Sequence, residues 1–106
     1  MGPENNEAQV KTISRRKTKL KHPRLYRVIL LNDDYTTMDF VVSILETVFA
    51  KSPAEAVQIM LRVHNQGMGV CGLYPKEIAE MKIAEVHERA RSAGYPLQCR
   101  MDEEGG

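Results

Sequence analysis

Six side chains along the middle of the sequence have the types that bind a cation beside an apolar group. Two neighbouring carboxylates repel each other, which costs stability unless a cation occupies the site. The cation could be a metal ion or an amine, because an amide oxygen and a neutral imidazole would accept hydrogen bonds from an ammonium group. Two methionines would then contact an apolar side chain. The six residues are Asn32, Asp33, Asp34, Met38, Met60 and His64.

Each of these residues also has an ordinary structural explanation. Asn-Asp-Asp sequences form turns, methionines fill cores, and a histidine on an apolar helix face usually packs without binding anything. On residue types alone, these explanations are favoured over a binding site. A divalent metal held by Asp33, Asp34 and His64 is a further hypothesis, although the three follow no recognised ligand spacing. Gly67 and Gly69 lack the pattern of a phosphate loop, and no serine has the sequence context of a hydrolase nucleophile.

The charge of the chain divides into a basic arm and an acidic domain. The 106 residues have a formal net charge of +1. Residues 1–24 contain seven basic and two acidic side chains, whereas the remainder contains eight basic and twelve acidic side chains. A basic arm can bind nucleic acid by releasing counterions from phosphates. Because no aromatic residue interrupts this arm and the rest of the chain is acidic, a solvated arm is favoured.

The hydrophobic pattern predicts the elements that position these residues. An apolar run over residues 25–31 predicts a strand, and its second half, apolar on both faces, indicates a central place in a sheet. A capping box, with Thr36 as N-cap and Asp39 three residues later, predicts the start of a helix. A second capping box that begins at Ser52 predicts another helix, which ends at Gly67.

The remaining elements complete an α+β pattern. The sequence predicts a short strand over residues 70–74, a helix from Pro75 to Gly94, and a last strand with alternating apolar residues over 97–101. The acidic tail from Asp102 onward is expected to be solvated. The order β-α-α-β-α-β predicts a two-layer sandwich, in which three helices cover one face of a three-stranded antiparallel sheet that follows a flexible N-terminal arm.

Nothing in the sequence directs the chain to a membrane or an oxidising compartment. Its longest strongly apolar run, residues 28–31, is far shorter than the roughly 20 residues that span a bilayer. The N-terminal residues lack the apolar core of a secretory signal. Cys71 and Cys99 have no CxxC partner, so they are expected to be buried thiols in a reducing compartment. The bacterial cytoplasm is therefore the expected location.

Three stretches of the sequence together resemble one protein family. They are YRVILLNDDYTTMDFVV, AVQIMLRVHNQGMGVCGLY and EIAEMKIAEV. From about Leu25 to Met101 the chain resembles ClpS, the adaptor of the bacterial ClpAP protease. The resemblance implies an α/β sandwich of three strands and three helices, without enzymatic activity or a cofactor. It also implies that the chain binds N-degron proteins, whose first residue is Phe, Leu, Tyr or Trp, and passes them to the unfoldase ClpA for degradation by ClpP.

The resemblance also assigns roles to individual residues. The family's contacts with the substrate α-amino group fall on Asn32, Asp34 and His64. Asp33 matches a contact with the backbone just after the first substrate residue. Met38 matches a gatekeeper that excludes the β-branched side chains of Ile and Val. The implied apolar pocket consists of Thr36, Met38, Val41, Met60, Val63 and Leu97.

Partner contacts follow from the same resemblance. The face that binds the N-terminal domain of ClpA matches Glu77 and Lys82, and the arm, residues 1–24, would engage the unfoldase while residues 25–106 form the adaptor core. One departure from the family is Thr37, where many members have proline, which predicts a less rigid helix start and an intact pocket. A monomer without nucleic acid or a metal is expected. The alternative is a nucleic-acid or ribosome-associated module that uses the basic arm.

Overall fold

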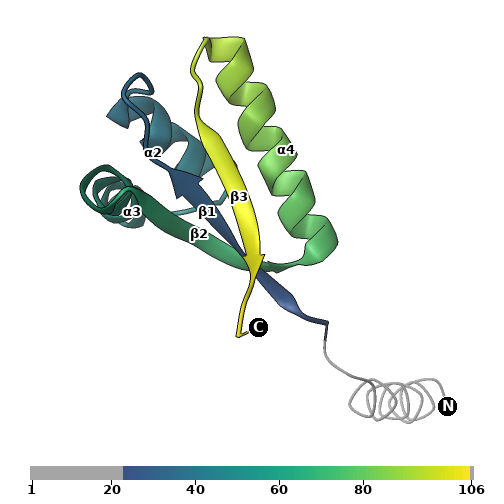
Figure 1. Cartoon of the computed structure of the whole chain (residues 1–106). Coiled ribbons are helices and arrows are strands. Elements are labelled where there is room, and N and C mark those ends of the chain that lie inside the picture. The colour runs from purple at the N-terminus through teal and green to yellow at the C-terminus, as the bar shows by residue number, and fades with distance from the viewer. Residues whose placement is uncertain (1–22, 106) are drawn as a thin grey trace, which may run out of the picture.

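Three helices pack against a three-stranded sheet in this chain (Figure 1). The computed structural model describes residues 23–105. The predicted α+β sandwich and its order β-α-α-β-α-β are confirmed. The predicted arm, residues 1–24, lies almost wholly outside the described residues. The elements are β1 (Leu25–Leu31), α2 (Met38–Thr47), α3 (Pro53–Gln66), β2 (Met68–Pro75), α4 (Lys76–Ala93) and β3 (Gln98–Glu103).

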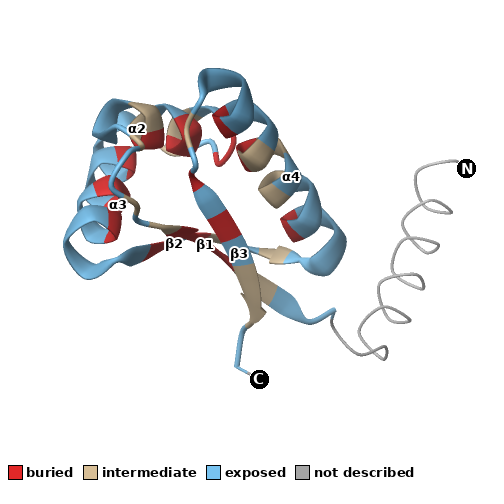
Figure 2. Ribbon diagram, turned by 45° about the horizontal axis from the view of Figure 1, so that its top comes forward, coloured by how far each residue is buried: buried red, intermediate tan, exposed pale blue. Residues whose placement is uncertain are grey.

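The sheet has the strand order β2-β1-β3, and both outer strands run antiparallel to β1. β1 is central, as predicted, with an outer strand on each side, and its residues Val28, Ile29 and Leu30 are all buried. β2 carries a bulge opposite the step from Val28 to Ile29, which leaves Cys71 as an extra residue. Figure 2 shows the three helices on one face of the sheet, so the fold has two layers.

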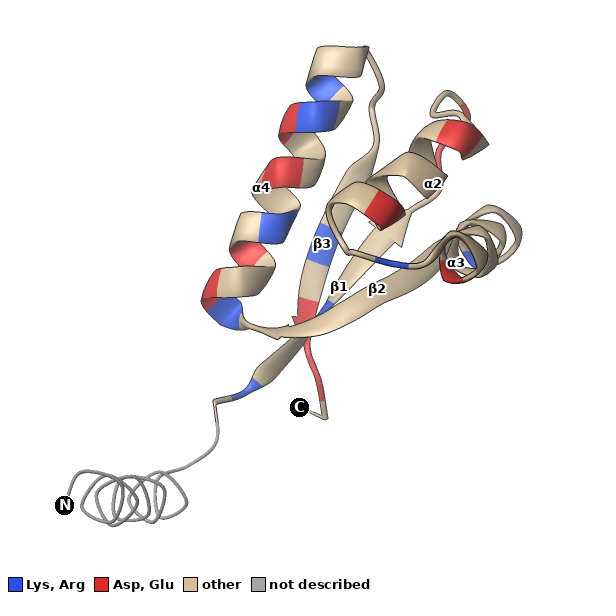
Figure 3. Cartoon of the chain, turned by 180° about the vertical axis from the view of Figure 1, so that it is seen from behind, with Lys and Arg blue, Asp and Glu red and all other residues tan. Residues whose placement is uncertain are grey.

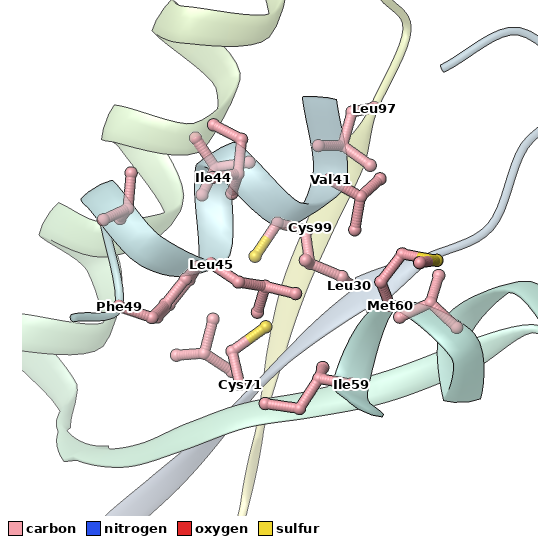
Figure 4. Packing of buried hydrophobic residues seen from close by; sticks show 14 of the residues in the cluster. Leu30, Val41, Ile44, Leu45, Phe49, Ile59, Met60, Cys71, Leu97 and Cys99 are labelled. Atoms are coloured by element: carbon pink, nitrogen blue, oxygen red, sulfur yellow. The ribbon is translucent and has the colours of Figure 1, made fainter. Parts of the chain in front are cut away.

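The core lies between the inner face of the sheet and the helices (Figure 4). Leu30 of β1 and both Ile44 and Leu45 of α2 are fully buried there. The thiols of Cys71 and Cys99 also lie in this core, as expected. Burial raises the pKa of both thiols, that of Cys99 to about 12. At neutral pH the two thiols are therefore uncharged packing groups.

The start of α2 differs from the prediction by one residue. Thr37 is the N-cap, and its hydroxyl oxygen accepts a hydrogen bond from the Phe40 N–H at 3.1 Å. The Thr36 hydroxyl is already engaged, because it donates to the Asp33 carboxylate at 2.7 Å. The predicted capping box of Thr36 and Asp39 is therefore wrong.

α3 begins and ends where the sequence predicts. The capping box of Ser52 and Glu55 is formed in both directions, and Gly67 ends the helix with a left-handed φ of 90°. The side of α3 that carries Val57 and Leu61 stays uncovered, with these residues 41% and 43% exposed. The core therefore takes its contacts from the other side of the helix alone.

β3 continues farther than predicted. Asp102 and Glu103 belong to the strand and form ion pairs with Arg27 at 2.9 Å and with Arg24 at 2.8 Å. The expectation of a solvated tail is therefore wrong for these two residues, although such partly exposed pairs contribute little to stability. Figure 3 shows acidic and basic residues interspersed along α4 as well. Within residues 23–105, no helix combines the length and the apolar content that crossing a bilayer requires.

Candidate functional site

A cavity of about 230 Å³ opens where the end of β1, the start of α2 and the second half of α3 meet. Residues from two separate stretches, 32–41 and 60–64, line it. Nine of the ten residues predicted to contact a ligand are thereby brought together. They are Asn32, Asp33, Asp34, Thr36, Met38, Val41, Met60, Val63 and His64.

The polar lining of the cavity faces solvent. Asn32, Asp34 and His64 are exposed, and within residues 23–105 no hydrogen bond or ion pair occupies the Asp34 carboxylate. The backbone N–H of Asn32 donates to the Gly67 carbonyl at 2.9 Å, which fixes the end of β1 to the end of α3. His64 lies in the last turn of α3, shortly before Gly67. An exposed carboxylate, amide and neutral imidazole can all accept hydrogen bonds from a cation.

Asp33 differs from Asp34, because its carboxylate bonds to its own turn. Oδ1 accepts the backbone N–H groups of Tyr35 at 2.8 Å and of Thr36 at 2.7 Å, and Oδ2 accepts the Thr36 hydroxyl at 2.7 Å. Partial burial raises the pKa of Asp33, but the hydrogen bonds from Thr36 and Tyr35 together outweigh burial and hold this pKa below its usual value. Repulsion between the two carboxylates therefore does not by itself require a bound cation.

The apolar lining comes from two helices. Val41 of α2 and both Met60 and Val63 of α3 are at most 9% exposed and belong to the core. Met38, the first residue of α2, is 43% exposed and is not a buried core residue. The cavity thus joins exposed hydrogen-bond acceptors to an apolar surface. Such a site suits an ammonium group that is linked to an apolar side chain.

Comparisons with known proteins identify the family. The family model of the ATP-dependent Clp protease adaptor protein ClpS matches residues 21–100. The ClpS adapter protein of Nitratidesulfovibrio vulgaris is 58% identical over 84 residues, which cover 79% of this chain and 84% of the relative. That of Desulfatibacillum aliphaticivorans is 48% identical over 104 residues, which cover 98% of this chain and 100% of the relative. The chain belongs to the ClpS family.

A solved structure of a ClpS protein shares the fold. It is the structure of Agrobacterium tumefaciens ClpS2 bound to L-phenylalaninamide, with a TM-score of 0.76 and 37% sequence identity. The match covers 78% of this chain and 100% of that one. The resemblance to ClpS and the fold it implies are therefore confirmed.

Leu97 is the predicted ClpS pocket residue that does not line the cavity. It is 2% exposed and lies in the same core cluster as Val41 (Figure 4). Its contact with a substrate side chain stays a prediction. One group at the site was not predicted from the sequence: the Gly67 carbonyl, which accepts the hydrogen bond from the Asn32 N–H. Only the helix-ending position of this glycine pointed to it, because a backbone group carries no residue-type signature.

The carboxylates and the imidazole are not arranged as a metal-binding set. In the part of the chain that the structure describes, no three side chains of His, Cys, Asp or Glu are grouped so that they could hold a metal ion. Asp33, Asp34 and His64 share the cavity without forming such a group.

The residues that match the family's ClpA-binding face lie on α4, outside the cavity. Glu77 is exposed in the first turn of this helix. Lys82 is half-buried, and its Nζ donates to the carbonyl of Val48, the C-cap of α2, at 2.9 Å. The same Nζ lies 5.6 Å from the centre of the Tyr74 ring on β2, so Lys82 links α4 both to the end of α2 and to β2. Three exposed apolar residues occupy this stretch of the sequence: Leu73, Ile78 and Met81.

Proposed function

We propose that this chain is an adaptor that binds the first residue of N-degron proteins, Phe, Leu, Tyr or Trp, and delivers these proteins to the ClpA unfoldase for degradation by ClpAP. The observation that carries the proposal is the cavity at the end of β1, where exposed acceptors meet an apolar surface. L-phenylalaninamide, the ligand of the related ClpS2, has the same two parts, an α-amino group and an apolar ring. On this proposal the chain is a monomeric binding protein of the bacterial cytoplasm, without a cofactor or catalytic activity.

The polar side of the cavity recognises the amine. A free α-amino group has an unperturbed pKa of about 7.7–8.0 and is mostly cationic at neutral pH. Asp34 supplies the opposite charge, and Asn32 and a neutral His64 accept further hydrogen bonds. Hydrogen bonds to charged groups contribute about 1.5–3 kcal/mol each. An acetylated N-terminus lacks both the charge and the donors, so it would leave Asp34 unpaired.

The apolar side of the cavity takes the first side chain of the substrate. Burial of a Phe or Leu side chain contributes about 1.5–3 kcal/mol. Association costs about 4–15 kcal/mol, so neither the amine nor the side chain is sufficient alone. The buried residues Val41, Met60 and Val63 give the site a fixed shape, since they are held by the core. A side chain that branches at Cβ would meet Met38, which gives the site its selection against Ile and Val.

Delivery uses a part of the molecule away from the cavity. The arm joins the fold at Leu25, whereas the cavity lies beyond Leu31, and the length of β1 separates these points by about 20 Å. The arm would engage ClpA, while Glu77 and Lys82 with their exposed apolar neighbours would contact its N-terminal domain. Leu73, Ile78 and Met81 are exposed and close to these two residues in the sequence, and exposed apolar side chains that form a patch are typical of protein interfaces. The adaptor can therefore hold a substrate and the unfoldase at the same time.

Fluorescence anisotropy with labelled peptides that differ only in their first residue tests the binding function. Among the twenty first residues, Phe, Leu, Tyr and Trp should bind most tightly. Acetylation of the Phe peptide should weaken binding by at least about 100-fold, because the charge-assisted hydrogen bonds are lost together. Equal binding of the free and acetylated peptides would refute the proposal.

Deletion of residues 1–22 tests the delivery function and the alternative function together. The shortened chain should bind the Phe peptide as tightly as the full chain, but a Phe-first reporter protein should no longer be degraded by ClpAP. A nucleic-acid module that acts through the arm would instead show affinity for nucleic acid that the deletion removes. Unchanged degradation by the shortened chain would refute the role of the arm.

A further inference from the structure

Asp33 is the centre of the turn between β1 and α2. Three donors converge on its carboxylate at 2.7–2.8 Å: the N–H groups of Tyr35 and Thr36 and the Thr36 hydroxyl. An ionised carboxylate has about four acceptor positions, so the turn itself fills three of them. Hydrogen bonds to a charged acceptor are also among the stronger ones. The Asp33 carboxylate is therefore committed to holding the turn.

This turn determines where Asp34 is placed. Asp34 is exposed and follows Asp33 directly, and no hydrogen bond among the described residues holds its carboxylate. The backbone is fixed on both sides, because the Asn32 N–H bonds to the Gly67 carbonyl before it and Thr37 caps α2 after it. Between these two points, the bonds to Asp33 are the ones that close the turn. The direction of the Asp34 side chain thus depends on Asp33.

We propose that Asp33 is a positioning residue, whose carboxylate folds this turn so that Asp34 meets the α-amino group of the substrate. The inference rests on the proposed function and gives the two neighbouring carboxylates different tasks. Asp33 is satisfied by donors inside the turn, and Asp34 is left open to the ligand. The family resemblance implies that Asp33 also contacts the substrate backbone directly. Such a contact would have to use the one acceptor position, of about four, that the turn leaves open.

Asparagine and alanine at this position distinguish positioning from direct contact. In Asp33→Asn, the amide oxygen can accept the same two N–H groups and the amide nitrogen can donate to the Thr36 hydroxyl oxygen, so the turn is kept without the charge. In Asp33→Ala, all three donors lose their acceptor. A role in direct contact, by charge or by a free acceptor, is lost in both variants. Asp39→Asn is the matched control, since Asp39 is an exposed acid in the first turn of α2 that does not line the cavity.

Two measurements on each variant test the proposal. Amide hydrogen exchange of the peptide-free protein reports on the turn. The Tyr35 and Thr36 amides should exchange at least about tenfold faster in Asp33→Ala than in the wild type and keep their protection in Asp33→Asn. Affinity for a Phe-first peptide reports on the placement of Asp34. It should fall at least about tenfold in Asp33→Ala, and Asp33→Asn should recover most of that loss.

Several results would overturn the proposal. If Asp33→Asn binds the peptide as weakly as Asp33→Ala while its turn amides stay protected, the carboxylate acts on the ligand directly. If Asp33→Ala keeps the amides protected, Asp33 does not hold the turn. Should Asp33→Ala fail to fold, Thr36→Val removes a single bond of the turn and Thr36→Ser keeps it; because Thr36 also lines the cavity, this pair is judged by amide exchange, which should be faster in Thr36→Val alone. If the wild type binds no Phe-first peptide, the proposed function fails, and the positioning role fails with it whatever the exchange rates are.

Discussion

Met38→Ala should widen the range of first residues that the cavity accepts. Met38 lines the cavity and is 43% exposed, whereas Met60, which lines it too, is 9% exposed. Truncation of a buried methionine costs about 2–5 kcal/mol of stability. We expect Met38→Ala to cost less than about 1 kcal/mol, because much of its side chain already faces water and alanine favours the helix. Specificity can therefore be measured on a folded domain.

The size of the change in specificity follows from the space that is created when the Met38 side chain is truncated. In an apolar pocket, one methylene that fits or clashes changes binding by about 1–3 kcal/mol, or about 10–200-fold. Peptides that begin with Ile or Val should gain this factor. The Phe-first peptide should lose less than about tenfold, since Val41, Met60 and Val63 still line the cavity. The ratio of Phe to Val affinity should thus fall by at least about tenfold.

Competition anisotropy against one labelled Phe-first peptide measures both affinities on the same scale. Met81→Ala is the matched control, because Met81 is 67% exposed on α4 and does not line the cavity. This control should leave the ratio of Phe to Val affinity unchanged. If folded Met38→Ala still rejects peptides that begin with Ile and Val, Met38 is not the filter, and the assignment of the first side chain to this surface is refuted.

Three further predictions concern the turns. Ala50→Gly should raise the free energy of unfolding, measured in urea, by about 1 kcal/mol, because Ala50 has a φ of 53° that glycine adopts without strain. A drop in stability would contradict this prediction. Gly67→Ala should lower the free energy of unfolding by about 1 kcal/mol, because Gly67 has a φ of 90° that alanine adopts only with strain. An added Cβ would meet no atom within 4 Å, so the cost comes from the backbone alone, and a neutral substitution would contradict this. Because the folded pKa of Asp33 is lowered, its contribution to stability is complete above the unfolded value of about 3.9 and is lost as the pH falls through the folded pKa. When the pH is lowered below about 4, the urea midpoint of unfolding should fall less for Asp33→Asn than for the wild type. If the two midpoints fall in parallel with pH, Asp33 makes no such contribution.

The fold could be predicted because its determinants are local. A strand that is apolar on both faces must be central, and residues 28–30 of β1 are indeed buried within the sheet. The ends of α3 follow from Ser52 and Gly67, which satisfy backbone groups only a few residues away. Such features need no knowledge of the rest of the chain.

The predictions from the sequence are wrong where a side chain bonds to a competing or a distant partner. Thr36 has the right type for a helix cap, but its hydroxyl bonds to Asp33 instead. Asp102 resembles part of a solvated tail until the pairing of β1 with β3 places Arg27 beside it. The bond from Lys82 to the end of α2 spans 34 residues and has no signature in the sequence. Side-chain partners across elements therefore required the structure.

The candidate site was only partly predictable from chemistry. Residue types alone favoured ordinary packing, and the resemblance to ClpS was needed to assign roles to the individual residues. The structure brings nine of these residues to one cavity, whereas Leu97 is buried in the core. The different roles of Asp33 and Asp34 could not be predicted. The two residues are adjacent and of the same type, and they differ only in the hydrogen-bond donors that reach their carboxylates.

The affinity of the Asp34→Asn variant for a Phe-first peptide tests the central claim most directly. Asp39→Asn is the matched control, since both substitutions remove one exposed carboxylate and only Asp34 lines the cavity. We predict that Asp34→Asn binds at least about tenfold more weakly than the wild type, the contribution of one charge-assisted hydrogen bond, and that Asp39→Asn changes affinity by less than about threefold. An Asp34→Asn variant that binds the peptide as tightly as the wild type would contradict the account.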